Sequence, residues 1–133
     1  MNKRIIHTKK APQPKASYSQ AINVGDFLFI SGQGPIDPHN GLITSEDVEK
    51  QTIQVLKNIE SILQSEGLDF EDVVKVSIFL RDMKDYEKVN NIYNNYFQKN
   101  PPARTTIQAT PPGNIKIEID AIAYYQRSRK NES

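Results

Sequence analysis

The sequence contains no cysteine. Disulfide bonds, thiolate catalysis and zinc sites built on sulfur are therefore excluded, and a reducing compartment is favoured. Histidine is also scarce, because only His7 and His39 are present, far apart in the sequence. Two such residues cannot make a metal site by themselves, so we expect the protein to hold no metal.

An excess of charge of one sign and long apolar runs are missing as well. Seventeen basic residues stand against sixteen acidic ones, so we expect no nucleic-acid partner. No segment resembles a signal peptide or is long enough to span a bilayer, which favours a cytoplasmic protein without a membrane partner. A chain of 133 residues fits one domain, expected over residues 1–125, followed by a polar, disordered tail at 126–133.

The spacing of apolar and turn-forming residues predicts six strands and two helices. Strands are expected at residues 3–8, 18–23, 27–31, 72–80, 103–109 and 115–125. One helix is expected to begin at the cap-like segment 44–47 and to stop at Gly67, with Val48, Thr52, Val55, Ile59 and Ile62 on its apolar face. A second helix is expected to begin at Asp82 or Asp85 and to end before Pro101. This order predicts an α+β fold, in which two helices pack on one face of a mixed six-stranded sheet.

The last two predicted strands carry the best clue to chemistry. Because side chains alternate along a strand, Arg104 and Thr106 share one face of the first of them. In the second, Ile115, Ile117, Ile119 and Ala121 form an apolar stripe, which leaves Glu118 and Asp120 opposite. The turn at 111–114 predicts that the two strands pair antiparallel and bring Arg104 and Glu118 to one polar face. That face can bind a small carboxylate at Arg104 and a water at Glu118; the alternative is a structural ion pair.

Several short motifs follow one another at the spacing of a known family. They are Tyr18-Ser19-Gln20-Ala21, Ser31-Gly32-Gln33 with Pro35 and Pro38, Val89-Asn90, Pro102-Ala103-Arg104 and Ile117-Glu118-Ile119. Over roughly residues 4–125, the chain resembles the RidA (YjgF) family of small trimeric imine deaminases. Members of this family are also described in places as translation inhibitors or endoribonucleases.

The resemblance implies both an assembly and a reaction. It implies a chorismate-mutase-like fold and a homotrimer whose sheets form a central barrel, with one site in each cleft between subunits. A mixed polar and apolar sheet face opposite the helices is also expected to need such a cover. The implied reaction is hydrolysis of 2-iminobutanoate or 2-iminopropanoate to a 2-oxo acid and ammonia, without a cofactor. In the family pattern Arg104 holds the substrate carboxylate and Glu118 orients the attacking water.

Five further residues are expected to bind the 2-imino acid or 2-oxo acid ligand. They are Tyr18 as an aromatic wall, Ser31 and Gly32 at a strand end, Asn90 on a helix, and Thr106 where many bacterial members carry cysteine. The sequence departs from the family pattern at Ala16-Ser17, where Gly-Pro is usual, and at Gly34, where a bulkier apolar residue is usual. Both departures lie beside predicted pocket residues and can alter which substrate fits.

Two other functions compete with the enzyme. The same clefts can serve a non-catalytic trimer that binds a metabolite or regulates a partner protein. RNA cleavage is the weaker alternative, because the net charge is close to zero and the sequence offers no histidine pair for a ribonuclease.

Overall fold

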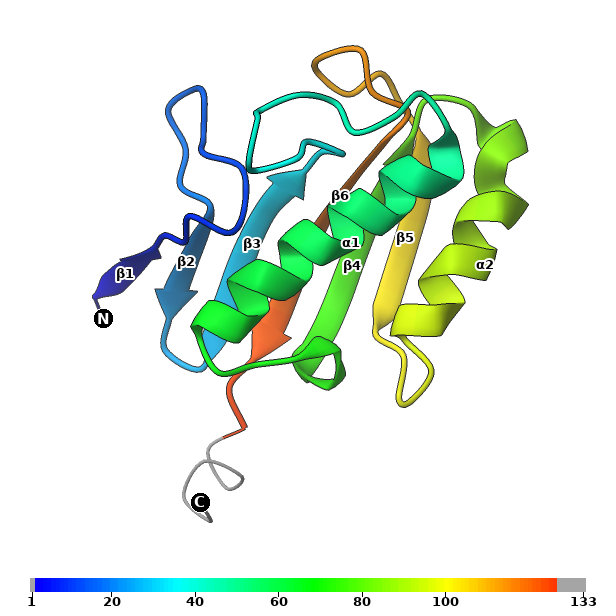
Figure 1. The fold of residues 1–133 in the computed structure, drawn as a ribbon. Helices are drawn as coiled ribbons and strands as arrows, with labels where there is room; N and C mark the ends of the chain where they lie inside the picture. Colours follow the sequence, from blue (N-terminus) through cyan, green and yellow to red (C-terminus); the bar gives the residue numbers. More distant parts are fainter. Residues whose placement is uncertain (1, 127–133) are drawn as a thin grey trace.

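The computed structural model describes residues 2–126 and contains one mixed sheet covered by two helices. The strands are β1 (Lys3–Ile6), β2 (Ala21–Val24), β3 (Phe27–Gln33), β4 (Val73–Leu80), β5 (Ala103–Gln108) and β6 (Ile117–Tyr124). The α-helices are α1 (Val48–Ser65) and α2 (Tyr86–Tyr96), and short 3₁₀ helices precede β4 and α2 at Phe70–Asp72 (η1) and Met83–Asp85 (η2). Both α-helices lie on the same face of the sheet (Figure 1), which confirms the predicted α+β architecture.

Most of the predicted tail, residues 127–133, lies outside the described residues. Gln126 is described, and its side-chain amide donates a hydrogen bond of 3.0 Å to Asp72 Oδ1. Gln126, which the sequence assigned to the tail, therefore contacts the domain.

The strand order in the sheet is β1-β2-β3-β6-β4-β5. Neighbouring strands run antiparallel except β4 and β5, which are parallel. The predicted pairing of the last two strands is therefore wrong, because β4 lies between them. The segment between β5 and β6 is not a tight hairpin but crosses the end of β4. Val76, Ile78 and Leu80 of β4 are almost fully buried, and a strand this apolar gains most from the central position.

The register of β4 decides which face each polar side chain occupies. Side chains of residues directly opposite one another on neighbouring strands project to the same face. Val76 is opposite both Ala121 and Arg104, which places Arg104 on the face covered by the helices. Phe79 is opposite Glu118, which places Glu118 on the other, open face. Within one chain, the prediction that Arg104 and Glu118 share a face is therefore wrong.

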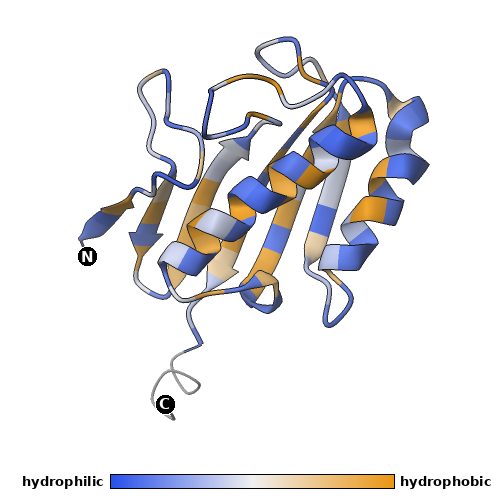
Figure 2. Ribbon diagram, viewed as in Figure 1, coloured by the Kyte–Doolittle hydropathy of each residue, from blue (hydrophilic) through white to orange (hydrophobic). Residues whose placement is uncertain are grey.

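Helix α1 begins one turn later than the first possible cap. Asp47 is the N-cap, and its carboxylate accepts the backbone N–H of Lys50 at 3.0 Å. All five predicted apolar-face residues of α1 are buried against the sheet, from Val48 to Ile62. The hydropathy colouring shows the expected alternation of polar and apolar positions along both helices (Figure 2).

The open face of the sheet carries a row of partly exposed aromatic residues. Phe27 and Phe29 remain 42% and 44% exposed, and Tyr124 lies against Phe27 with ring centroids 5.6 Å apart. Val73 is buried and lies opposite Ala123 on the helix side. An aromatic surface of this kind is typical of a face that another protein surface covers.

A buried asparagine fixes the loop that follows β3. Asn58 of α1 is 1% exposed, and its amide donates to the carbonyl oxygens of Gly34 at 3.1 Å and Ile36 at 2.9 Å. Its own side-chain oxygen accepts from Gln54 at 3.0 Å. The loop is thereby tied to a rigid helix through one side chain.

We expect Asn58→Ala to lower the free energy of unfolding by about 2 kcal/mol, because it leaves two backbone carbonyls without their donor. Gln54→Ala is the matched control and should cost less than about 1 kcal/mol, since it removes a single side-chain contact from a less buried residue. Urea unfolding of the three proteins measures both values. Equal costs for the two variants would contradict this role of Asn58.

Candidate functional site

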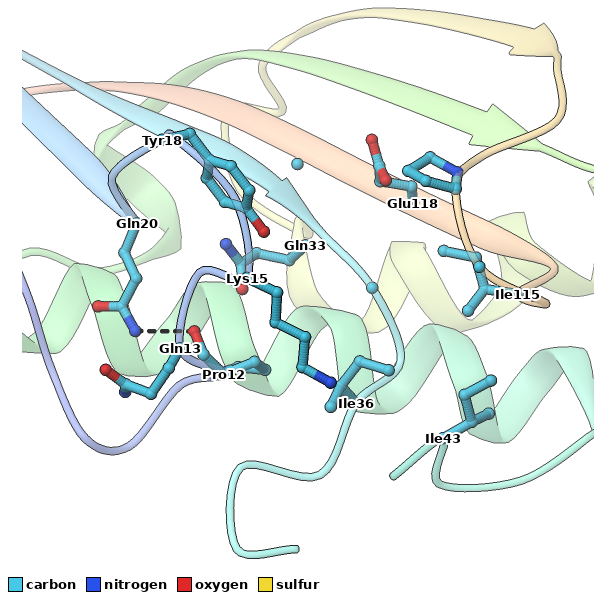
Figure 3. A pocket seen from close by; sticks show the side chains of 14 residues that line it. Pro12, Gln13, Lys15, Tyr18, Gln20, Gln33, Ile36, Ile43, Ile115 and Glu118 are labelled. Carbon is cyan, nitrogen blue, oxygen red and sulfur yellow. Dashed lines mark hydrogen bonds between the residues drawn. The ribbon is translucent and has the colours of Figure 1, made fainter. Parts of the chain in front are cut away.

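A cavity of about 320 Å³ opens where three loops meet the ends of β3 and β6. Among its lining residues are Lys15, Tyr18, Gly32, Gln33, Ile36, Ile115 and Glu118. Figure 3 shows that Tyr18 and Lys15 come from the loop before β2, whereas Glu118 comes from β6. We call this space the glutamate cavity. It contains three of the predicted site residues, Tyr18, Gly32 and Glu118.

The wall that carries Tyr18 is held by a buried glutamine. Gln20 is 2% exposed; its side-chain oxygen accepts the backbone N–H of Thr8 at 2.7 Å, and its amide donates to the carbonyl of Pro12 at 2.9 Å. This pattern ties the loop to the start of β2. Sequence reasoning assigned Gln20 no role, although a glutamine directly before an apolar strand was the available signal.

Ser31 belongs to the same support rather than to the lining of the cavity. Its hydroxyl donates to the carbonyl of Ser19 at 2.6 Å, and its backbone N–H donates to the carbonyl of Gln20 at 3.0 Å. Ser31 is not among the described residues that line the glutamate cavity. Its side chain is therefore already engaged in joining β3 to the Tyr18 loop.

The opposite wall depends on an arginine that the sequence did not single out. Arg81 donates from Nε to the carbonyl of Ile115 at 2.8 Å and from Nη2 to the carbonyl of Gly113 at 3.0 Å. Gly113 has a φ of 84°, a left-handed conformation that glycine adopts without steric cost. Arg81 thus holds the turn that replaces the expected hairpin and directs Ile115 into the cavity.

Glu118 is the ionisable group placed deepest in this arrangement. Burial raises the pKa of its carboxyl, and the nearby carboxylate of Asp120 raises it further. The carboxylate lies against the backbone of β3: a Cβ atom at Gly32 would come within 2.4 Å of Glu118 Oε2. Glycine at position 32 is therefore required for Glu118 to occupy this place. A carboxyl with a raised pKa suits proton transfer near neutral pH.

A second polar group lies between β5 and α2. Arg104 donates from Nη2 to the hydroxyl of Tyr86 at 2.9 Å. Its guanidinium carbon is 4.8 Å from the ring centroid of Tyr93 and 5.7 Å from that of Tyr86, within the range of cation–π attraction. Asn90 lies one turn along α2, and its side chain lowers the pKa of the Tyr86 hydroxyl. We call Arg104, Thr106, Tyr86, Asn90 and Tyr93 the arginine cluster.

The arginine cluster has unused hydrogen-bonding capacity. Within residues 2–126, the buried hydroxyls of Thr106 and Tyr93 have no hydrogen-bond partner. Burial raises the pKa of Tyr93 to about 12, so its hydroxyl stays neutral and can donate. Buried polar groups without a partner are costly, and they are most often satisfied by a ligand or water. Beside a guanidinium, such donors suit a carboxylate.

The predicted site residues thus fall into two groups on different sides of the sheet. Arg104, Thr106 and Asn90 are not among the described lining residues of the glutamate cavity. The hydrogen bond from Arg104 to Tyr86 also replaces the structural Arg104–Glu118 ion pair that the sequence left open.

Metal-binding and membrane-spanning features were also sought in the described chain. Among residues 2–126, no group of three or more histidine, aspartate or glutamate side chains is placed to hold a metal ion. None of the helices in this range combines the length and the apolar character needed to cross a bilayer.

We expect Glu118→Gln to stabilise the protein near pH 7 but not near pH 4. A raised pKa means that the fold disfavours the ionised carboxylate, so wild type loses stability as the pH rises through the ordinary glutamate value toward the raised one. The isosteric amide lacks this titration. Thermal melts at both pH values measure the difference, with exposed Glu71→Gln as control. A gain in melting temperature that is equal at both pH values would contradict the proposed burial effect.

Comparison with known proteins shows the family and the fold to which the chain belongs. The family model described as Endoribonuclease L-PSP matches residues 8–125. A RutC family protein of Pyrococcus horikoshii is 48% identical over 123 residues, covering 92% of this chain and 98% of that protein. Human 2-iminobutanoate/2-iminopropanoate deaminase is 43% identical over 122 residues, covering 91% and 89%. The crystal structure of E. coli TdcF with bound serine has a TM-score of 0.88 at 34% identity, covering 92% and 99%. The chain belongs to the RidA (YjgF) family, to which the name Endoribonuclease L-PSP is also applied.

Proposed function

We propose that this protein hydrolyses small reactive 2-imino acids, such as 2-iminobutanoate and 2-iminopropanoate, to 2-oxo acids and ammonia. The observation that carries the proposal is the half-buried Glu118 carboxylate in a cavity wide enough for a small acid. The 43% identity to the human deaminase supports the same reaction. TdcF binds serine, in which the carboxylate and the nitrogen are attached to the same carbon. A 2-imino acid has the same arrangement, so the bound serine supports a ligand of this class.

The reaction needs few protein groups, because an iminium carbon is already electrophilic. Glu118 accepts a proton from water as the water oxygen bonds to that carbon. The carboxyl returns this proton to the nitrogen. It takes up the remaining hydroxyl proton as the carbon–oxygen double bond forms and the carbon–nitrogen bond breaks, and this last proton passes to ammonia or solvent. Ammonia leaves with a 2-oxo acid as the other product. A raised pKa allows the same carboxyl to accept the proton and return it. The step consumes one water and needs no cofactor.

The substrate carboxylate requires a cation, and Arg104 is the residue that we assign to this role. A guanidinium can donate two parallel hydrogen bonds to a carboxylate, and the neighbouring Thr106 hydroxyl can add a third. The stacking of Arg104 on Tyr93 leaves the fork pre-oriented. Asn90 and Tyr18 are assigned to the walls of the same site.

These assignments require more than one copy of the chain. Arg104 and Glu118 lie on opposite faces of one sheet, so a small acid cannot reach both within a single chain. We therefore infer that the arginine cluster of one subunit completes the glutamate cavity of the next. The homotrimer implied by the family resemblance supplies such clefts, and the aromatic row around Phe27 and Phe29 would be covered in its centre.

Arg104→Ala should reduce kcat/KM for 2-iminobutanoate by at least about a hundredfold, because it removes a charge-assisted anchor. Arg104→Lys should recover only part of the loss, since an ammonium lacks the fork. Thr106→Ala should cost about tenfold or less, and Thr106→Cys should be nearly neutral. The rates are measured on imines generated in situ by an amino-acid oxidase.

Each variant is first checked by light scattering for wild-type assembly. Binding without hydrolysis in wild type would replace the enzyme by the metabolite-binding alternative. A loss in Thr106→Ala as large as that in Arg104→Ala would show that the hydroxyl takes part in the chemistry.

Mixed trimers test the shared cleft directly. Homogeneous Arg104→Ala and Glu118→Ala proteins should both be nearly inactive, because each lacks one half of every cleft. When the two chains are co-assembled at equal amounts, about a quarter of the clefts should combine an intact Arg104 with an intact Glu118. Activity near that fraction of wild type is expected, with a mixture of separately assembled trimers as control. No recovery in verified mixed trimers would place both residues in one subunit's site and overturn the cleft.

A further inference from the structure

The Arg104 side chain is held from two directions by tyrosines of α2. Its Nη2 atom donates to the Tyr86 hydroxyl at 2.9 Å, and its guanidinium lies 4.8 Å from the Tyr93 ring centroid. Tyr93 is 4% exposed and acts as a fixed floor, whereas Tyr86 is 37% exposed and lies at the rim. The two contacts restrain different motions: stacking fixes the plane of the guanidinium, and the hydrogen bond fixes its rotation within that plane.

We propose that Tyr86 is a positioning residue whose hydroxyl orients the Arg104 guanidinium for the substrate carboxylate. When the phenol ionises, the phenolate competes with that carboxylate for the guanidinium. This inference rests on the proposed function, because it takes Arg104 as the carboxylate anchor. An arginine side chain loses considerable rotamer freedom when it is fixed, so a contact that fixes it before the ligand arrives improves ligand affinity. Tyr86 supplies that contact in the free protein.

Two neighbours of Tyr86 favour ionisation of its phenol. A hydrogen bond from Asn90, one turn further along α2, lowers the pKa of Tyr86, and the positive charge of Arg104 lowers it further. Asn90, which the sequence matched to a polar position of the family, thus acts on Tyr86 as well.

The other charged groups around Tyr86 are few. From β5 it faces Arg104; from η2 and the first turn of α2, Lys84 and Glu87 line the same shallow depression with Met83. Lys84 lies 3.5 Å from the Asp82 carboxylate, which is its nearest ion pair. Burial raises the pKa of Tyr93 to about 12, so Tyr93 stays neutral while Tyr86 titrates. Among the tyrosines that contact Arg104, Tyr86 is therefore the one that ionises first.

Ionisation of Tyr86 changes what Arg104 can bind. A phenolate next to the guanidinium is a counter-ion already in place, and it competes with the carboxylate of the ligand. Affinity for the carboxylate should therefore fall as the pH approaches and passes the lowered pKa of Tyr86. A purely structural tyrosine would not produce this dependence.

The test is calorimetric binding of 2-oxobutanoate, a stable compound of the product class, to assembled wild type and Tyr86→Phe. The variant keeps the ring and removes only the hydroxyl. We expect Kd to rise about fivefold in the variant near pH 7.5, the cost of fixing one rotamer-rich side chain when the ligand binds. Between about pH 7.5 and pH 9.5, Kd of wild type should rise as Tyr86 begins to ionise, while that of Tyr86→Phe should stay flat.

Matched controls separate the Tyr86 hydroxyl from other causes. Tyr96→Phe makes the same change on the same helix, where the side chain packs against Phe70, and it should leave both Kd and its pH dependence at wild-type values. Lys84→Met removes the neighbouring ammonium, and its Kd should still rise at alkaline pH as in wild type. Persistence of the alkaline rise of Kd in Tyr86→Phe, or a Kd within twofold of wild type throughout, would overturn the inference while leaving the proposed function intact.

The deaminase proposal can also fail while the role of Tyr86 stands. If 2-oxobutanoate binds wild type, weakens in Tyr86→Phe and yet no imine is hydrolysed, the role of Tyr86 stands and the deaminase proposal fails. Absence of binding to wild type would overturn both.

Discussion

The placement of β4 between β6 and β5 is the constraint on which the rest of the structure depends. Its apolar side chains bury it at the centre, so it must pair on both edges, antiparallel with β6 and parallel with β5. Once Val76 lies opposite Arg104 and Phe79 lies opposite Glu118, the faces of both polar residues are fixed. Neither residue can change sides without moving every buried neighbour on its strand.

The two polar groups are built by different means. The glutamate cavity is assembled from loops, and buried or partly exposed polar side chains such as Gln20 and Arg81 tie those loops to the sheet. The arginine cluster instead lies on a strand and a helix, with an aromatic ring as its support. The first arrangement shapes a space and shifts a carboxyl pKa. The second holds a guanidinium in a fixed orientation.

Much of the architecture followed from local patterns in the sequence. The number and order of the strands and helices, the buried stripe of α1 and the buried isoleucines of β6 were predicted correctly, because side-chain periodicity is a local property. Strand pairing is non-local, and the turn at 111–114 suggested a hairpin where the chain crosses β4. The error about Arg104 and Glu118 follows from that one misjudged connection. The supporting roles of Gln20, Arg81 and Tyr86 depend on partners distant in the sequence or across the fold, which periodicity does not reveal.

The contact between Gly32 and Glu118 has a consequence for the history of the family. Because the carboxylate occupies the volume that any side chain at position 32 would need, a side chain there would force Glu118 to move. A lineage that exchanges the glutamate for a shorter residue frees position 32 to accept alanine or serine. A lineage that first acquires a side chain at 32 must displace the carboxylate. Joint variation of these two positions across relatives would therefore record which branches retained the buried acid and which gave it up.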